Sequence, residues 1–442
     1  MSDVRALGSW PGVGMMMEMG TKDATAGLVS QDREPQDRAG MWMTHDDHCG
    51  GDVEVEVRED PGAEALHAWD LLVDRAPGTD VTQLSVWAGL RGRVGFTPLY
   101  LLAYHDGELV GGAQILTRRV PVLGSVGYLP YGPLVTPEAP AAEDIARRLV
   151  DALAALAQRR LRVLFIQPPE GAQDISDALL HRGFRPSSAG IAPQGSIRID
   201  LTADLAVIRS KFGKRLKSWT NRWESRGVTV RVGDESDIPL LAELMSSSAQ
   251  HQGYTPLPLD YMLALYRELA ATGHAVLYVG EVDGVPVAAD LMTGCGDMVR
   301  GRLSGFDRSG EAMRLSVPAA IRWEMIKWAK EQGYRWFDFG GLRPETLAAL
   351  LDGSECSADT LPTADQPKVT FGGTAFRYPT PVEMIRPAAL RAIYDVAWRS
   401  ATGRRMFTDV KSLLRGSRRR RSPKLEPEDR TSPVAAWESA PR

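Results

Sequence analysis

The sequence predicts an α/β (α+β) protein with two tandem domains of one design, each a mixed, mostly antiparallel sheet flanked by helices. Three observations predict this fold: a hairpin that occurs twice, an amphipathic helix that follows each hairpin, and a buried strand that follows each helix. The 442 residues leave room for two or three domains. A hydrophobic content of 43% is enough for a sizeable core.

The two hairpins are the clearest part of the repeat. Segments 100–113 and 276–289 each contain a strand, an Asp-Gly turn and a returning strand. Asp-Gly favours the positive φ angles that a tight hairpin turn needs. The turns are therefore expected at Asp106-Gly107 and Asp283-Gly284, 177 residues apart.

Each hairpin leads to an amphipathic helix, expected at about 141–160 and 317–332. The apolar residues recur at helical spacing, and they are Ile145, Leu149, Leu153 and Leu156 in the first helix and Ile321, Met325 and Trp328 in the second. Ser316 is the expected N-cap of the second helix, and Gly333 is expected to end it. The buried strands follow at 161–166 and 334–339, 173 residues apart. Two similar offsets indicate an internal repeat.

Composition excludes several classes of protein. Lys and Arg number 52 against 56 Asp and Glu, so the net charge of -4 excludes a uniformly basic nucleic-acid coat and an acidic disordered chain. No apolar run is long enough to span a bilayer. Three cysteines cannot form a disulfide framework, and a cytoplasmic location is expected.

Pattern and charge divide the chain into five parts. We expect a disordered segment at 1–51, a first domain at 52–208, a basic interdomain segment at 209–231, a second domain at 232–415 and a disordered basic tail at 416–442. In the first part, His45, Asp46, Asp47, His48 and Cys49 have metal-ligand chemistry, but no second half-site appears at zinc spacing. We therefore expect no metal and no cofactor.

The order hairpin, helix, strand matches the GNAT acyltransferase fold better than a doubly wound parallel sheet, which needs helices between nearly all strands. GNAT enzymes usually hold the pyrophosphate of acyl-CoA on a glycine-containing turn before the central helix. The equivalent segments here, 137–140 and 311–318, lack those glycines. The fold therefore predicts acyl transfer, while this turn argues against CoA as the donor.

Four segments resemble the Fem-type aminoacyl-tRNA-dependent peptidyltransferases, which are tandem GNAT-like proteins. They are the Tyr-Leu-Pro-Tyr-Gly-Pro run at 128–133, the basic stretch 209–231, Phe-Asp-Phe-Gly-Gly at 337–341, and 368–372 with the helix after it. Together they cover roughly residues 55–400. The resemblance implies transfer of an amino acid from a charged tRNA to an amine, often of a peptidoglycan precursor in cell-wall synthesis. It also implies a peripheral contact with the inner face of the membrane.

The sequence departs from the family pattern at several positions. Tyr131 stands where the family often has Arg, Thr136 near an Asp position, and Pro367 where Phe precedes the lysine. The stretch 343–368 is long and acidic. These departures put a standard cell-wall acceptor in doubt, and relatives in polysaccharide export or antibiotic synthesis leave the acceptor open.

The resemblance assigns catalysis to Lys368, whose ammonium would stabilise the oxyanion of ester aminolysis. The alternative is a solvated loop lysine. Asp338, on a predicted buried strand, would orient the attacking amine or pair with Lys368; alternatively, it caps the Gly-Gly turn that follows. A wall for the acceptor is predicted at Tyr128, Tyr131, Gly132 and Pro133, the alternative being a turn with packed rings.

The basic stretch 209–231 is the predicted tRNA contact. Its basic residues would neutralise phosphates while Trp219 and Trp223, on one expected helix, stack on unpaired bases. Alternatively, both Trp residues face the core. The predicted tRNA-binding residues are Lys211, Lys214, Arg215, Lys217, Arg222 and, further along the chain, Arg302.

Two other functions remain open. One is an acyl-CoA-dependent N-acyltransferase of the same fold, which would bind acyl-CoA without tRNA. The other is a non-catalytic RNA-binding or scaffold protein, which would keep its function without Lys368.

Overall fold

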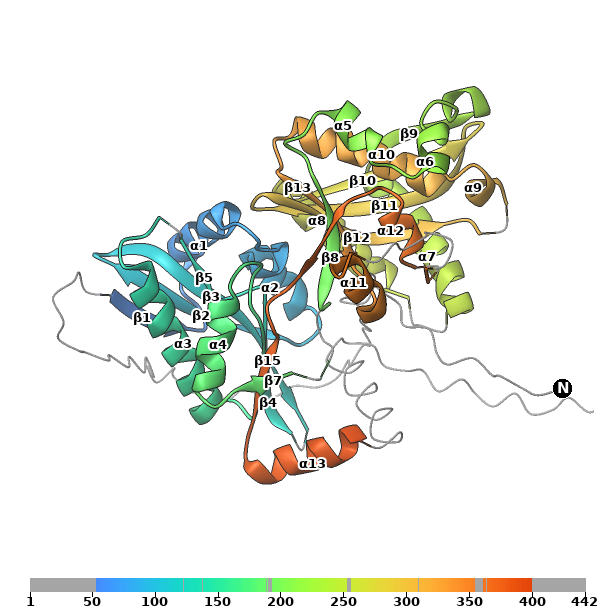
Figure 1. The fold of residues 1–442 in the computed structure, drawn as a ribbon. Helices are drawn as coiled ribbons and strands as arrows, with labels where there is room; N and C mark the ends of the chain where they lie inside the picture. The colour runs from blue at the N-terminus through green and yellow to red at the C-terminus, as the bar shows by residue number, and fades with distance from the viewer. Residues whose placement is uncertain are drawn as a thin grey trace, which may run out of the picture.

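The computed structural model describes residues 53–399, except 122, 137, 188, 190–192, 253–255, 309, 354–360 and 363. It contains two large sheets that lie side by side, each covered by helices (Figure 1). The predicted terminal segments 1–51 and 416–442, with the candidate ligands His45–Cys49, lie outside the described residues.

The first sheet has eight strands in the order β1-β2-β3-β4-β6-β15-β7, and β5 pairs with β3. Its strands are β1 (Val53–Arg58), β2 (Thr97–His105), β3 (Glu108–Val120), β4 (Gly124–Pro130), β5 (Leu134–Val135), β6 (Val163–Gln167), β7 (Arg185–Pro186) and β15 (Val382–Ile385). The accompanying helices are α1 (Ala63–Arg75), the 3₁₀ turn η1 (Val81–Gln83), α2 (Ser85–Gly92), α3 (Ala142–Arg159), α4 (Gln173–His181) and α13 (Ala388–Arg399).

The second sheet has seven strands in the order β14-β8-β13-β12-β11-β10-β9. Its strands are β8 (Gly195–Asp200), β9 (Val228–Gly233), β10 (Ala275–Val282), β11 (Val285–Cys295), β12 (Met298–Phe306), β13 (Trp336–Gly341) and β14 (Thr374–Arg377). The helices are α5 (Leu205–Ser210), α6 (Lys214–Trp219), η2 (Glu224–Arg226), η3 (Glu235–Asp237), α7 (Ile238–Gln252), α8 (Leu259–Ala271), α9 (Glu311–Arg314), α10 (Val317–Glu331), α11 (Pro344–Leu351) and α12 (Gln366–Val369).

The predicted repeat is confirmed by strand order. In both sheets three antiparallel strands are followed by a parallel pair, β4 with β6 and β12 with β13. The connection between the parallel strands carries the amphipathic helix, α3 in the first half and α10 in the second. Each helix buries its predicted apolar face, since Ile145 and Leu149 of α3 and Ile321 and Met325 of α10 are fully buried.

Both Asp-Gly turns form as predicted. Asp106 and Gly107 have φ angles of 50° and 83°, and Asp283 and Gly284 have 50° and 80°. Two successive positive φ angles fit a right-twisted two-residue hairpin, and glycine adopts them without the clash of a Cβ atom.

Two strands are exchanged between the halves. β8 follows the first-half helices in the chain, yet it pairs with β13 and β14 of the second sheet. β15 comes after the second sheet and returns to the first, between β6 and β7. The chain therefore crosses between the sheets at both ends of the second half, which holds the halves together through backbone hydrogen bonds.

Helices α1 and α2 join the two halves through a common core. Trp69 of α1 and Trp87 of α2 share one buried cluster with Met262 and Leu265 of α8 and with Leu277 of β10. This continuous apolar contact fixes the angle between the sheets, because separating them would expose it to water.

One local expectation is confirmed in position only, and another is wrong. Ser316 occupies the N-cap position of α10, but it has a φ of 56° and its side chain makes no capping hydrogen bond. The basic segment is not one helix, because α6 ends at Trp219 and Trp223 lies in the turn before η2. The alternative, in which the Trp residues face the core, holds for Trp223. This residue is buried and donates its indole N–H to the Leu315 carbonyl oxygen at 2.9 Å.

The packing of α10 on β10 predicts the effect of a single methyl group. A Cβ at Gly280 would lie 2.5 Å from Cγ1 of Val317 and 3.0 Å from Ile321, so Gly280→Ala should destabilise the protein by about 1–3 kcal/mol. Gly89 of α2 has open space around a Cβ, so Gly89→Ala should be neutral or stabilising, by up to about 1 kcal/mol. Urea denaturation of both variants checks this, and equal midpoints would contradict the described packing.

Candidate active site between the two sheets

A buried group of charged side chains lies where the two halves meet. Arg300 of β12 donates from Nη1 to Oδ2 of Asp80 at 2.9 Å and from Nε to Oδ2 of Asp338 at 3.3 Å. Arg302 donates to the same Asp80 carboxyl at 2.9 and 3.0 Å. Asp80 precedes η1 in the first half, while the arginines belong to the second sheet. These four residues are called the junction cluster below.

Local structure places each member of the junction cluster. β12 and β13 are parallel neighbours, and Arg300 lies opposite Asp338 in their register. Arg302 follows two residues after Arg300 on the same strand. Asp80 is held at the start of η1, where its Oδ1 accepts from the Thr82 N–H at 3.0 Å. Arg300 also donates to the Thr79 carbonyl oxygen at 2.7 Å, so η1 is bound through its backbone as well.

The charges of the junction cluster compensate one another. Burial alone would raise the pKa of Asp80, but the adjacent Arg302 and Arg300 outweigh it and hold that pKa well below its usual range. Burial alone would lower the pKa of Arg300, but the surrounding tyrosines and carboxyls raise it well above its usual value. Asp80 is therefore ionised and Arg300 charged at neutral pH, and pairing makes their burial tolerable.

Asp338 has its carboxyl oxygens fully engaged. Oδ1 accepts from the Ser196 hydroxyl of β8 and from the Gly340 N–H at 2.8 Å. Oδ2 accepts from Arg300 and from the Tyr378 hydroxyl at 3.1 Å. The bond to Gly340 is the turn cap that sequence reading offered as the alternative to a direct role. The Asp338 carboxylate is therefore held in place by its hydrogen bonds, and it in turn holds the Gly340-Gly341 turn.

Two tyrosines cover the junction cluster. The guanidinium of Arg300 lies 4.7 Å from the ring centre of Tyr131, and the rings of Tyr131 and Tyr378 are edge to face at 5.7 Å. Burial raises the pKa of Tyr131 to about 12, so its hydroxyl stays protonated at neutral pH. Tyr131 comes from the turn after β4, and Tyr378 directly follows β14. The predicted wall residue Tyr131 thus reaches the same place as Asp338.

The other members of the predicted wall have different surroundings. Tyr128 packs with Val126 and Phe165 of the first sheet. Gly132 donates its N–H to the Gln167 carbonyl oxygen at 3.1 Å, and a Cβ there would lie 2.9 Å from Cδ1 of Leu129. The close backbone approach at Gly132 is therefore to protein atoms. Pro133 follows it through a cis peptide bond.

Lys368 is buried beside the same turn and is not a solvated loop lysine. It belongs to α12, and its Nζ donates to the Gly341 carbonyl oxygen at 2.5 Å. Burial lowers its pKa to about 8, with nearby Asp365 opposing the shift. Asp338 also contributes favourably to its charge. The two predicted catalytic residues therefore meet at one turn, Asp338 holding Gly340 and Lys368 binding Gly341.

The basic segment packs directly on the segment that follows Lys368. Gly213 donates its N–H to the Thr370 carbonyl oxygen at 2.8 Å, and the rings of Phe212 and Phe371 lie 5.1 Å apart. Four predicted tRNA-binding side chains are exposed, and they are Lys211, Lys214, Arg215 and Arg222. Lys217 is half-buried and donates to the Ser210 carbonyl oxygen at 2.8 Å. A cationic surface thus begins next to the buried lysine.

Arg302 has a different environment from the one predicted. Its side chain is only 9% exposed and is paired with Asp80, so it offers no accessible charge to an RNA phosphate. Sequence reading missed Asp80 and Ser196 altogether. Asp80 carries only the weak signal of an acid two residues before Thr82, which is typical of an N-cap. Its partners lie 220 and 222 residues away.

Two further properties of the described residues concern the requirements of a metal site and of a membrane-spanning helix. Within the described ranges, no group of three or more His, Cys, Asp or Glu side chains is arranged to hold a metal ion. None of the described helices has the length and apolar character needed to cross a membrane.

Comparisons with known proteins agree with this fold. A family model described as an acetyltransferase (GNAT) domain matches residues 210–346. The Lipid II:glycine glycyltransferase of Staphylococcus saprophyticus subsp. saprophyticus is 27% identical over 244 residues, which are 51% of this chain and 56% of that protein. The protein of the same name from Staphylococcus aureus strain MRSA252 is 25% identical over 226 residues, 48% of this chain and 53% of that protein.

Among solved structures, the crystal structure of FemX matches with a TM-score of 0.63 at 17% identity, covering 75% of this chain and 98% of that chain. This likeness confirms the tandem GNAT-like fold. The relatives confirm the predicted resemblance to the Fem-type transferases. The chain spans about half the length of the curated relatives it matches.

Removing one carboxyl from the junction cluster should be costly. Asp80→Asn leaves Arg300 and Arg302 buried with too little compensating charge, so we expect a loss of about 3–5 kcal/mol in the free energy of unfolding. Because the pKa of Asp80 is held below its usual value, this difference should persist from neutral pH down to about pH 4 and shrink only below that.

The control is the surface pair of Arg93 and Glu268, whose side chains are 59% and 26% exposed. Glu268→Gln removes an ion pair in water and should leave the urea midpoint unchanged within error. If Asp80→Asn behaved like this control, the junction cluster would not hold the halves together.

Proposed function

We propose that this protein is an acyltransferase that moves an amino acid from aminoacyl-tRNA to an amine of a peptide or peptidoglycan-precursor-like acceptor. The observation that carries the proposal is the position of Lys368. Its buried ammonium lies on the turn that Asp338 holds, between the junction cluster and an exposed basic segment. The names of the related glycyltransferases support an amino acid as the transferred group and a cell-wall precursor as the acceptor.

The reaction would proceed by direct aminolysis. The acceptor nitrogen attacks the ester carbonyl carbon of the charged tRNA, a C–N bond forms, and the carbonyl electron pair moves onto oxygen. Collapse of this intermediate breaks the bond to the ribose oxygen, which takes the proton that the amine loses. No protein base is required, and Lys368 would stabilise the oxyanion by its positive charge. A pKa of about 8 leaves Lys368 mostly charged at pH 7.

Asp338 would act in this scheme as a positioning residue. Its oxygens are occupied by Ser196, Gly340, Arg300 and Tyr378, so it has no free lone pair directed at a substrate amine. By fixing the Gly340-Gly341 turn it also fixes the carbonyl that binds Lys368. The ammonium is thereby held in one place before the substrate arrives, which lowers the cost of reorganisation in the transition state.

The donor and the acceptor would approach from different sides. The exposed Lys211, Lys214 and Arg215 lie next to the segment after Lys368, where they would meet phosphates near the acceptor end of tRNA. The turn at 128–133 would contribute to the acceptor side, with Tyr131 as the member that reaches the junction cluster. An acceptor of the lipid-linked kind would bring a cytoplasmic protein to the inner face of the membrane.

A transfer assay tests the proposal. Purified protein is given a labelled amino acid on tRNA together with candidate acceptor amines, and the product is identified by mass. We expect label on the acceptor, no product after RNase treatment, and no product with acyl-CoA as the donor. Product that survives RNase treatment would contradict the tRNA donor, and product from acyl-CoA alone would favour the ordinary GNAT reaction.

Lys368→Met should lower kcat by about 100-fold or more, because it removes the charge next to the developing oxyanion. The rate ratio of wild type to variant should decrease as the pH rises through about 8, since the wild-type lysine then loses its own charge. This ratio cancels the effects of pH on the substrates. Lys330→Met is the control, because Lys330 is partly buried and, like Lys368, donates to a carbonyl oxygen, that of Leu201. A constant ratio, or equal losses in the two variants, would contradict the catalytic role.

Charge reversal of the basic segment should weaken tRNA use without changing the chemical step. We expect Lys211→Glu/Lys214→Glu/Arg215→Glu to raise KM for charged tRNA at least tenfold, to flatten its salt dependence and to leave kcat nearly unchanged. The control reverses three exposed arginines elsewhere, Arg75, Arg159 and Arg377. Equal effects of the two triple variants would show only a general dependence on net charge.

A further inference from the structure

Helix α13 has two apolar faces, and only one of them is covered. Leu390, Tyr394 and Trp398 pack on the first sheet with Val126 and Phe165. The opposite side exposes Ile393 and Val396, whose exposed fractions of 65% and 68% are the largest among the exposed large apolar residues of the described chain. The helix lies at the lower end of the first half, away from the second sheet (Figure 1).

The exposed apolar residues form a continuous stripe. Ala389, Ala392, Ile393 and Val396 are all exposed, and their spacing of three, four and seven residues places them on one side of the helix. Single exposed apolar side chains need no explanation, but an apolar stripe bordered by charge is typical of an interaction surface. Arg399 borders the stripe, whereas Arg391 lies nearer the covered face, on the flank that lines the neighbouring cavity.

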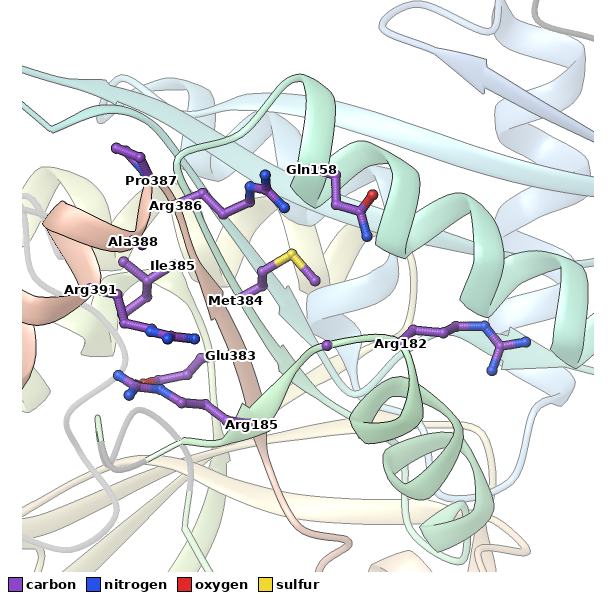
Figure 2. Close-up of a pocket in the computed structure, with 11 residues that line it drawn as sticks. Gln158, Arg182, Arg185, Glu383, Met384, Ile385, Arg386, Pro387, Ala388 and Arg391 are labelled. Carbon is purple, nitrogen blue, oxygen red and sulfur yellow. Dashed lines mark hydrogen bonds and ion pairs between the residues drawn. The ribbon is translucent and has the colours of Figure 1, made fainter.

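An arginine-lined cavity of about 300 Å³ opens beside α13 (Figure 2). Arg182 is paired with Asp151, and Arg185 is paired with Glu383 and Asp395. Arg386 and Arg391 also line the cavity, and no carboxylate among the described residues lies within ion-pair distance of either. In Figure 2 Arg386 extends toward Gln158, whereas Arg182 extends away from the cavity. Two guanidinium groups that form no ion pair with the described residues therefore line a concave site next to the apolar stripe.

We propose that α13 and this cavity form a docking surface for an anionic phospholipid bilayer. Ile393 and Val396 would enter the boundary between headgroups and acyl chains, while Arg386 and Arg391 bind lipid phosphates. Aliphatic side chains favour this partner over RNA, for which aromatic stacking groups would be expected. The adjacent sequence has matching charge, with nine Lys or Arg between 404 and 424 against one acid, Asp409.

The docking surface extends the proposed function. Only its biological role, and not the binding itself, rests on that function. Bilayer binding would carry the protein to a membrane-bound acceptor. It can be measured without turnover, so that failure of vesicle binding and failure of aminoacyl transfer are separate results.

Vesicle co-sedimentation of the full chain tests the docking surface. We expect binding to vesicles of phosphatidylcholine with phosphatidylglycerol and little binding to phosphatidylcholine alone. Ile393→Ser/Val396→Ser and, separately, Arg386→Glu/Arg391→Glu should each weaken partitioning at least tenfold. The matched controls are Val232→Ser/Val285→Ser, which removes similarly exposed apolar groups, and Arg75→Glu/Arg377→Glu, which reverses exposed charges elsewhere. Both should bind like wild type.

Three results would overturn the proposal. The first is wild-type vesicle binding by Ile393→Ser/Val396→Ser, because the segments outside the described residues would then account for the affinity. The second is loss of self-association by the same variant in sedimentation velocity, which would make the stripe an interface between two copies. The third is loss of tRNA binding by Arg386→Glu/Arg391→Glu with vesicle binding intact, which would assign the cavity to RNA.

Discussion

The contact between Asp80 and the two arginines of β12 is the constraint on which the rest of the structure depends. Asp80 belongs to the first half of the chain, while Arg300 and Arg302 belong to the second sheet. Asp80 and Arg300 are buried, and the Arg302 side chain is only 9% exposed. None of these charges could stay buried alone at an acceptable cost. The halves must therefore meet in one register, in which Arg300 also reaches Asp338 and through it the Gly340-Gly341 turn.

The exchanged strands add backbone hydrogen bonds to the same constraint. β8 brings Ser196 to Asp338 from the first-half side of the chain, and the segment from β14 to β15 brings Tyr378 to the same carboxyl before it returns to the first sheet. Each contact with Asp338 therefore comes from a different part of the chain. The result is a rigid support beneath Lys368, whose buried ammonium is the group that the proposed reaction uses. In the proposed reaction, donor and acceptor would approach this point from different sides.

The sequence predicted those parts of the molecule that depend on neighbouring residues. The Asp-Gly turns, the apolar faces of α3 and α10 and the order of the repeat follow from local pattern, so they were predicted correctly. Asp80 could not be found, because its partners are more than 200 residues away and no local period connects them. Trp223 was placed on a helix by its spacing from Trp219, but the turn after α6 directs its indole into the core. The burial of Lys368 likewise depends on a contact with a distant segment, the Gly341 carbonyl oxygen at the end of β13, which local pattern does not reveal.

The central claim is that Lys368 recognises the tetrahedral intermediate more strongly than the substrates. The most direct measurement compares the affinities of wild type and Lys368→Met for two RNA 3′-end mimics, one with a stable amide in place of the ester and one with a tetrahedral phosphonate joined to the acceptor. We predict that the variant loses affinity for the phosphonate by about the factor that it loses in kcat, while its affinity for the amide mimic changes little. Equal affinity of both proteins for the phosphonate would contradict the account.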